Sequence, residues 1–154
     1  MSLFGRREDD QPVRVMFMCV ENAGRSQMAA ALAERERELR GLGDTVEIHS
    51  AGTHPADAVH ANVVEALAEI DLDISDRVPT LVDLEELKRM DVLVTMGCYI
   101  AEFDPATFIE ETREWDLRNP EGEDLETTRE IREAVAECVS DLFDELEAEV
   151  DARV

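Results

Sequence analysis

The fold of this chain is decided by residues 13–33, which read VRVMFMCVENAGRSQMAAALA. Residues 13–18 are almost all apolar, which is typical of a strand that is buried on both faces of a sheet. From Ser26 onward the apolar side chains recur at helical spacing, with Met28 and Leu32 one turn apart. The stretch therefore predicts a buried strand, a loop and a helix over residues 26–39.

The rest of the chain continues to alternate strands and helices. We predict further strands at residues 46–48, 91–96 and 113–117, and further helices at residues 62–70, 83–89 and 125–149. Strands separated by helices favour a parallel sheet with helices on both faces. The predicted fold class is α/β, a single doubly wound domain with a four-stranded parallel sheet. We place this domain at residues 13–150, after a flexible N-terminal tail of residues 1–12.

Three residues with useful side chains follow the predicted strands. Cys19 ends the first strand, Ser50 ends the second, and Cys98 lies just past the third. In doubly wound sheets, ligands bind beyond the carboxyl ends of the strands. We therefore expect these three residues to meet at one mouth of the sheet.

The loop from Cys19 to Ser26 carries the groups that a tetrahedral oxyanion requires. Backbone N–H groups that open a helix point inward, and the helix dipole adds positive charge. Arg25 can hold two oxygens with its planar fork, and the positive field favours the thiolate form of Cys19. Ser26 can donate a hydrogen bond to that thiolate, while Asn22 and Gly24 tolerate the unusual backbone of a tight loop. The sequence thus predicts a thiolate that attacks a bound oxyanion.

The net charge of -23 limits the kinds of partner that can bind, because the chain has 38 acidic residues and only 15 Lys and Arg. A nucleic-acid backbone would be repelled, so no nucleic-acid partner is expected. The apolar periodicity argues against a disordered acidic chain. A surface so acidic, with Lys88 as its only lysine, resembles proteins from cells with molar internal salt. There the Debye length is about 3 Å, so self-repulsion is screened.

Composition also bears on compartment and on metal binding. No apolar run approaches the roughly 18 residues that span a bilayer, and residues 1–11 lack the apolar centre of a signal peptide. Three cysteines without a close pair argue against a disulfide framework or a zinc site, so a reducing cytoplasm is expected. His54, His60 and Asp57 match no metal-ligand spacing, and no metal is predicted.

These motifs resemble the low-molecular-weight protein tyrosine phosphatase superfamily and, within it, the arsenate reductases that share its fold. The resemblance is carried by residues 19–29, 50–53, 95–98 and 115–120, and it runs from residue 13 to the final helix. SQMA at residues 26–29 and MGC at residues 96–98 resemble the reductase branch, because a proline commonly follows the serine in the phosphatases.

The resemblance implies a role for each motif residue. Cys19 would be the nucleophile. The oxyanion would be bound by Val20, Glu21, Asn22, Ala23, Gly24, Arg25 and Ser26. Cys98 would attack the arseno-thiol adduct, release arsenite and form a disulfide with Cys19. No cofactor would be bound, and an external thiol would supply the electrons: thioredoxin, a glutaredoxin-like protein or a small thiol.

The chain departs from the family in its thiols. Residues 99–105 contain no cysteine, and Asp104-Pro105 stands where the family shows Cys-Pro. The third shuttle thiol of the reductases is therefore absent from its place. Cys138 falls on the apolar stripe of the last predicted helix and is interpreted as a packing residue. For Trp115, a place in the core and a place in the cleft are equally open.

A second departure is Asn119, which precedes Pro120 where the family has an aspartate as general acid. An amide cannot give up a proton, and losing a positioned acid typically costs roughly 10²–10⁴ in rate. Asp116 or Glu121 could substitute. The arsenate dianion carries a proton of its own, so the loss disfavours an aryl phosphate more than arsenate.

Three functions follow in order of preference. The leading hypothesis is an arsenate reductase in which a second thiol releases arsenite. The alternative is a low-molecular-weight protein tyrosine phosphatase that acts through a phosphocysteine intermediate. The third is an oxyanion-binding module without catalysis.

Overall fold

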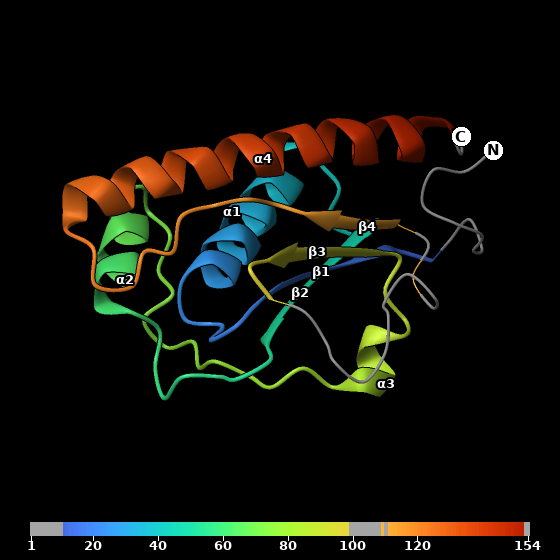
Figure 1. The fold of residues 1–154 in the computed structure, drawn as a ribbon. Coiled ribbons are helices and arrows are strands. Elements are labelled where there is room, and N and C mark those ends of the chain that lie inside the picture. Colours follow the sequence, from blue (N-terminus) through green and yellow to red (C-terminus); the bar gives the residue numbers. More distant parts are fainter. Residues whose placement is uncertain (1–10, 99–108, 110, 153–154) are drawn as a thin grey trace.

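The computed structural model describes residues 11–98, 109 and 111–152. Its centre is a sheet of four parallel strands in the order β2-β1-β3-β4 (Figure 1). The strands are β1 (Val13–Cys19), β2 (Val46–Gly52), β3 (Val92–Met96) and β4 (Glu111–Glu114). This confirms the predicted single α/β domain with a four-stranded parallel sheet.

Helices cover both faces of the sheet, as Figure 1 shows. They are α1 (Arg25–Leu39), α2 (Ala61–Ala68), α3 (Leu84–Leu87) and α4 (Leu125–Ala152). Helix α4 lies across α1 and α2 on one side, and the short α3 lies on the other side. No helix of the described residues combines the length and the apolar character that crossing a bilayer requires.

Strand β1 is buried on both faces, because its side chains alternate between two apolar clusters. Val15 and Phe17 pack with residues of α1 and α4, including Leu32. Met16 and Met18 face the opposite cluster around α3. This alternation explains why the sequence of β1 is continuously apolar rather than alternating with polar residues.

The order of the strands places a binding site at the end of β1. From β1 the chain passes to β2 on one side, and it later returns to β3 on the other side. The loops after β1 and β3 therefore diverge, and the space between them is where ligands of doubly wound sheets bind. Cys19 pairs with Met96, so the two strands end at the same level.

The largest correction concerns β2. The strand was predicted at residues 46–48, and it continues to Gly52. Ser50 pairs with Phe17 inside the sheet and does not reach the mouth as predicted. The extension follows β1, because the ladder between the two strands continues to the pair of Gly52 with Cys19. Gly52 also donates to the carbonyl oxygen of Thr80 and accepts from the amide of Val82, and no local pattern indicates either contact.

The other boundaries differ by a few residues. Strand β4 runs two residues earlier than predicted and ends at Glu114. Helix α3 is shorter than predicted and is only one turn long. Asp83 caps its start by accepting from the amide of Glu85. Helix α4 continues to Ala152. Most of the predicted tail, residues 1–10, and residues 99–105 with Asp104-Pro105 lie outside the described residues.

Candidate active site

Cys19 is the last residue of β1, and its side chain is buried in a small network of donors. Its Sγ lies 2.9 Å from Ser26 Oγ and accepts the amide of Asn22 at 3.3 Å. Asn22 Nδ2 donates to Ser26 Oγ at 2.7 Å, so the Ser26 hydroxyl lies between Asn22 and the sulfur. The Cys19 sulfur is thus held beside one backbone amide and one hydroxyl that can donate to it.

Asn22 holds the loop in the bend that the sequence predicted. Its φ of 52° is in the left-handed region, and its side chain is fully buried. The side-chain oxygen accepts from the amide of Thr80 and from Gln27 Nε2, each at 3.0 Å. The bend is therefore fixed by α1 on one side and by the segment before α3 on the other.

Helix α1 opens directly at the loop. It begins at Arg25, and no side chain of the described residues caps it. Its first internal bond is donated by Met28 to the carbonyl oxygen of Gly24, so the amides before Met28 are not used within the helix. Uncapped amides and the positive end of the dipole make this end of α1 suited to an anion.

Gly24 is required here by space. A Cβ at this position would lie 2.8 Å from Pro120 Cγ, closer than such contacts come. The loop is thereby packed against the segment that carries Asn119, although the two are far apart in the sequence.

Arg25 is held beside two loops. Its Nη1 donates to the carbonyl oxygen of Leu117 at 3.2 Å. Gly97 has a φ of 75°, which favours glycine, and a Cβ there would lie 2.8 Å from Arg25 Nη1, so a larger residue would displace the guanidinium. The turn after β3 and the segment after β4 thus position the charge that was predicted to hold an oxyanion.

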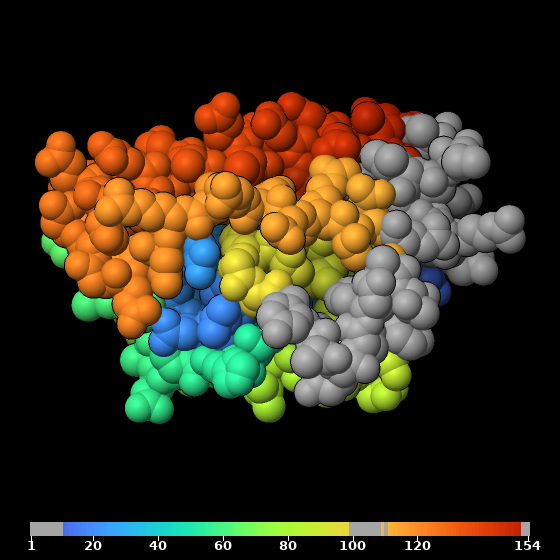
Figure 2. All heavy atoms as spheres, in the orientation of Figure 1, coloured from blue at the N-terminus to red at the C-terminus, as the bar shows by residue number. Residues whose placement is uncertain are grey.

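These elements enclose a cleft of about 210 Å³. It is lined by Cys19, Val20, Glu21, Gly24, Arg25, His60 and Asn119. In Figure 2 the loop after β1, in blue, is exposed between the segment before α4, in orange, and the segment after β2, in teal. Asn22, Ala23 and Ser26 are buried behind the cleft, and they support the loop without lining it.

His60 is a site residue that the sequence did not indicate, since it matches no metal-ligand spacing and belongs to none of the motifs. The segment after β2 follows the loop closely: Ala56 donates to the carbonyl oxygen of Glu21, and the His60 amide donates to that of Ala23. This brings the imidazole to the rim of the cleft. His54 is exposed and instead contacts Thr53.

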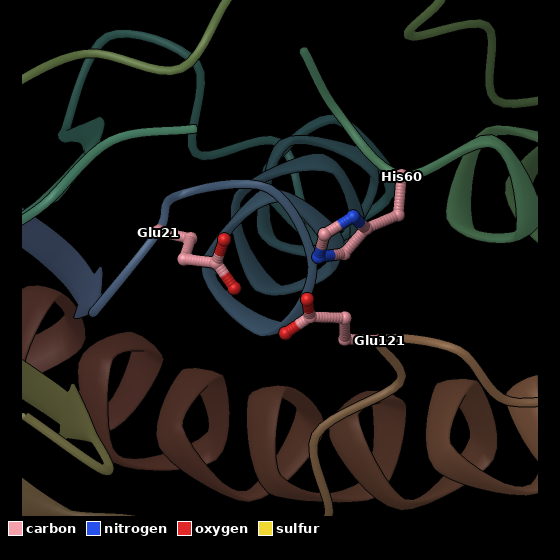
Figure 3. Close-up of side chains that lie close together, drawn as sticks. All are labelled: Glu21, His60 and Glu121. Atoms are coloured by element: carbon pink, nitrogen blue, oxygen red, sulfur yellow. The ribbon is translucent and has the colours of Figure 1, made fainter. Parts of the chain in front are cut away.

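Glu21, His60 and Glu121 gather at this rim, with their polar atoms within 4.8 Å of one another (Figure 3). A hydrogen bond between the carboxyls of Glu21 and Glu121 raises the pKa of Glu21, and burial acts in the same direction. His60 and Arg25 act in the opposite direction. Asp116, the other substitute acid that was considered, is exposed and does not line the cleft.

Cys98 lies two residues beyond β3, at the same end of the sheet as Cys19. It is half-buried, and its thiol donates to the carbonyl oxygen of Met18 at 3.4 Å. Burial raises the pKa of Cys98 to about 11, so this thiol stays protonated at neutral pH. Both cysteines are free thiols, and Cys98 does not line the cleft itself.

Cys138 and Trp115 lie outside the cleft. Cys138 is half-buried on α4 between the buried Val135 and Val139, and burial raises its pKa. Trp115 packs on the core, with its ring centroid 5.7 Å from that of Phe17. Of the two places left open for Trp115, the structure shows the core.

The chain is similar to known proteins over most of its length. Residues 14–152 match the family model described as low molecular weight phosphotyrosine protein phosphatase. A protein named "Putative arsenate reductase" from Halobacterium salinarum is 49% identical over 136 residues, which cover 88% of this chain and 94% of that protein.

Two solved structures are also similar. The thioredoxin-dependent arsenate reductase of Corynebacterium glutamicum is 34% identical with a TM-score of 0.72, and the match covers 89% of this chain and 63% of that one. A structure described as an arsenate reductase in the phosphate binding state is 26% identical with a TM-score of 0.73, covering 86% of this chain and 97% of that one.

Proposed function

This chain belongs to the low molecular weight phosphotyrosine protein phosphatase family, and within that family we propose that it is an arsenate reductase. The observation that carries the proposal is the position of two thiols. Cys19 lies on the oxyanion loop, and Cys98 lies at the end of the neighbouring strand. The similarity to arsenate reductases from other organisms supports the same function.

The first step is a substitution at arsenic. Arsenate would rest on the amides at the start of α1, with its oxygens against the Arg25 guanidinium. The Cys19 sulfur, supported by Ser26 and Asn22, forms the S–As bond while one As–O bond breaks. The leaving hydroxyl takes a proton and departs as water, and arsenic stays pentavalent.

The second step is the reduction. The sulfur of a second thiol attacks Cys19 Sγ, and the electron pair of the S–As bond stays on arsenic. Arsenite leaves, and the two thiols become a disulfide. We assign this second thiol to Cys98, with an external thiol as the alternative. The high pKa of Cys98 means that it must lose its proton during this attack.

An external reductant must then restore the two thiols. We propose a thioredoxin-like protein, a glutaredoxin-like protein or a small thiol. One similar reductase is described as thioredoxin-dependent, which supports the first. Cys138 is half-buried on α4, away from the cleft, so we assign it no shuttle role. Such a cycle requires a reducing compartment, and we propose the cytoplasm.

The phosphatase reading remains the second candidate, because the family model is that of a phosphatase. In that reaction the Cys19 sulfur would take a phosphoryl group and water would hydrolyse the phosphocysteine. The same cleft and the same loop would serve, and Cys98 would have no role.

One pair of assays in molar KCl separates the candidates. The protein is given arsenate with a thiol reductant, and separately para-nitrophenyl phosphate. We expect arsenite from the wild type, none from Cys19→Ser, and an unchanged rate from the control Cys138→Ser. Mass spectrometry of arsenate-treated protein should show a Cys19–Cys98 bridge. Nitrophenol release without arsenite would establish the phosphatase instead, and binding of arsenate without either reaction would establish a binding module.

A further inference from the structure

The cleft lacks a proton donor at the position where its family has one. Asn119 lines the cleft, but its Oδ1 accepts from the amide of Glu121 at 3.1 Å. An asparagine amide has no proton to transfer. Cleavage of the As–O bond still requires that the leaving hydroxyl become water, so another side chain at the cleft must supply a proton.

Glu21 is the acidic side chain that lines the cleft together with Cys19. Its carboxyl points toward the carboxyl of Glu121, which comes from the segment before α4 (Figure 3). Two carboxyls can form a hydrogen bond only when a proton lies between them. That hydrogen bond, then burial and the charge of Glu121, raises the pKa of Glu21.

The contact between these two residues is held by the surrounding backbone. On one side, the amide of Ala56 donates to the carbonyl oxygen of Glu21 at 3.0 Å. On the other, Asn62 Nδ2 donates to the carbonyl oxygen of Pro120 at 2.8 Å, and the buried Pro120 lies against Gly24. Both carboxyls therefore extend from anchored segments, so their approach is built into the fold.

We infer that Glu21, which shares a proton with Glu121, is the proton donor of this active site and replaces the aspartate that the family has at the position of Asn119. The inference rests on the proposed function. As the Cys19 sulfur bonds to arsenic, the hydroxyl of the arsenate dianion leaves with the Glu21 proton and departs as water. The pair is left as two carboxylates, which then recover one proton from solvent.

The charges around the pair suit this exchange. Glu121 favours the protonated form of Glu21, whereas Arg25 and His60 favour the ionised form. Glu121 thus strengthens the hold of Glu21 on its proton before the reaction, and Arg25 and His60 favour the carboxylate that forms. His60 also lines the cleft, so it is close to both the donor and the substrate.

The test uses three carboxyl-to-amide variants, with Glu130 on the exposed side of α4 as matched control. Arsenite formation and phenyl phosphate hydrolysis are followed against pH in molar KCl with a chelator present. We expect Glu21→Gln to lower the faster of the two reactions by about 10² or more. Glu121→Gln should move the alkaline decline in rate to lower pH, because the shared proton is lost. Glu130→Gln should match the wild type.

A rescue separates proton donation from a structural role. Asn119→Asp restores the family's acid, so the double variant Glu21→Gln/Asn119→Asp should recover most of the lost rate. Proton donation by Glu21 is overturned if Glu21→Gln reacts like the wild type, if the aspartate gives no rescue, or if the chelator abolishes the wild-type rate, since a metal ion would then join the carboxyls.

The two proposals fail in different ways. If the wild type hydrolyses phenyl phosphate but forms no arsenite, only the reductase function is overturned. The role of Glu21 is then tested by comparing phenyl phosphate hydrolysis in the wild type and in Glu21→Gln. If arsenite forms at the same rate with Glu21→Gln, only the donor is overturned. A wild type that turns over neither substrate overturns both.

Discussion

At the scale of single residues, the chemistry depends on the groups that contact the Cys19 sulfur. Ser26 and Asn22 both direct hydrogens at it, and Asn22 also directs one at the Ser26 oxygen. The Ser26 hydroxyl therefore lies between the Asn22 amide group and the sulfur, and residues of the loop itself hold it there.

Ser26→Ala removes the side-chain donor without adding bulk. A hydrogen bond to a charged group is worth about 1.5–3 kcal/mol, so we expect the reactivity of Cys19 as a nucleophile to fall by roughly tenfold or more. The measurement is the rate of iodoacetamide labelling of Cys19 at pH 7, followed by peptide mass spectrometry. Cys19→Ser identifies the signal of this thiol, and labelling as fast as in the wild type would contradict the assigned role of Ser26.

Gly24→Ala tests the contact between the loop and Pro120. The new Cβ would lie 2.8 Å from Pro120 Cγ, and overpacking of this kind costs about 1–3 kcal/mol. We expect a lower denaturant midpoint and weaker arsenate binding. Gly43→Ala is the control, because its nearest contact would be Glu38 Oε1 at 3.8 Å. Equal midpoints for the two variants would show that the loop can move away from Pro120.

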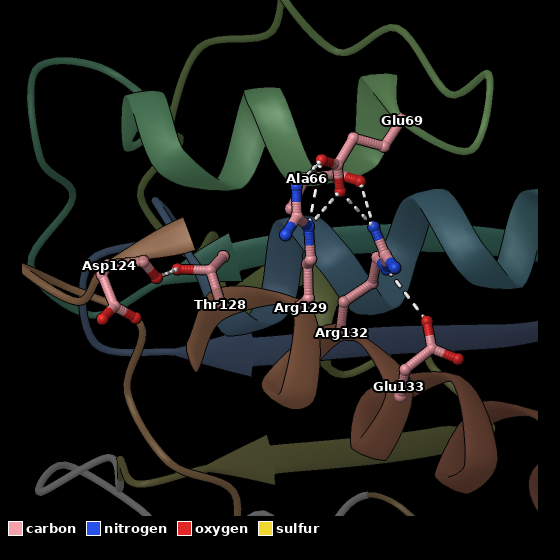
Figure 4. A network of polar contacts seen from close by, with 7 residues as sticks. All are labelled: Ala66, Glu69, Asp124, Thr128, Arg129, Arg132 and Glu133. Carbon is pink, nitrogen blue, oxygen red and sulfur yellow. Dashed lines mark hydrogen bonds and ion pairs between the residues drawn. The ribbon is translucent and has the colours of Figure 1, made fainter. Parts of the chain in front are cut away.

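At the scale of elements, the segment that carries Asn119 and Glu121 is positioned by the junction of α2 and α4. Glu69, at the end of α2, accepts from Arg129 and Arg132 of α4, and Arg132 also donates to the Ala66 carbonyl oxygen (Figure 4). Thr128 donates to the carbonyl oxygen of Asp124 at the start of α4. The contacts between α2 and α4 therefore fix the start of α4, and with it the preceding segment that carries Asn119 and Glu121.

This junction predicts a dependence of stability on pH. Hydrogen bonds from Arg129, and then from Arg132, lower the pKa of Glu69 to about 2 from its ordinary 4.5. A lowered carboxyl pKa adds stability above the unfolded value, and this contribution is lost as the pH falls from about 4.5 to about 2.

Glu69→Gln should therefore unfold at a lower temperature than the wild type at pH 7, and this difference should shrink as the pH falls below 4.5. Thermal melts at several pH values are the measurement. Glu133→Gln, which removes only an exposed partner of Arg132, is the control. A difference in melting temperature that is the same at every pH would rule out the ion pair as its cause.

At the scale of the whole molecule, the net charge of -23 dominates. Arginines of this chain pair with acidic residues across elements, as Arg113 does with Glu145 and Arg40 with Asp144. With 38 acidic residues against 15 basic ones, such pairs leave most of the negative charge unbalanced. The remaining repulsion is weak only where salt screens it.

We therefore expect the protein to lose folded structure in dilute buffer and to be stable in molar KCl. Circular-dichroism melts across a range of KCl concentrations are the measurement, with sucrose at matched osmotic strength as the control for excluded solute. The similarity to a protein of Halobacterium salinarum supports this expectation. A melt that is unchanged between dilute buffer and molar KCl would contradict the expected dependence of stability on salt.

The sequence by itself determined the order of strands and helices, the parallel sheet and the loop from Cys19 to Arg25. These features depend on local patterns: apolar runs, helical periodicity and the spacing of residues that share one loop. The place of Cys98 at the same end of the sheet as Cys19 also followed, because parallel strands end at a common edge, whereas Asn119 was indicated only by the resemblance to the family. The family model that matches residues 14–152 confirms the resemblance, and the roles of the individual motif residues stay predictions.

Only the tertiary structure decided which side chains meet. The extension of β2 to Gly52 depends on its pairing with β1, which continues to the pair of Gly52 with Cys19. His60 reaches the cleft because its segment is bonded along the loop, and Glu121 meets Glu21 because Pro120 packs on Gly24. These are contacts between residues far apart in the chain, and no periodicity or spacing carries them. Sequence patterns report the neighbours along a strand or helix, whereas the approach of Glu21 to Glu121 at this rim arises from packing between loops.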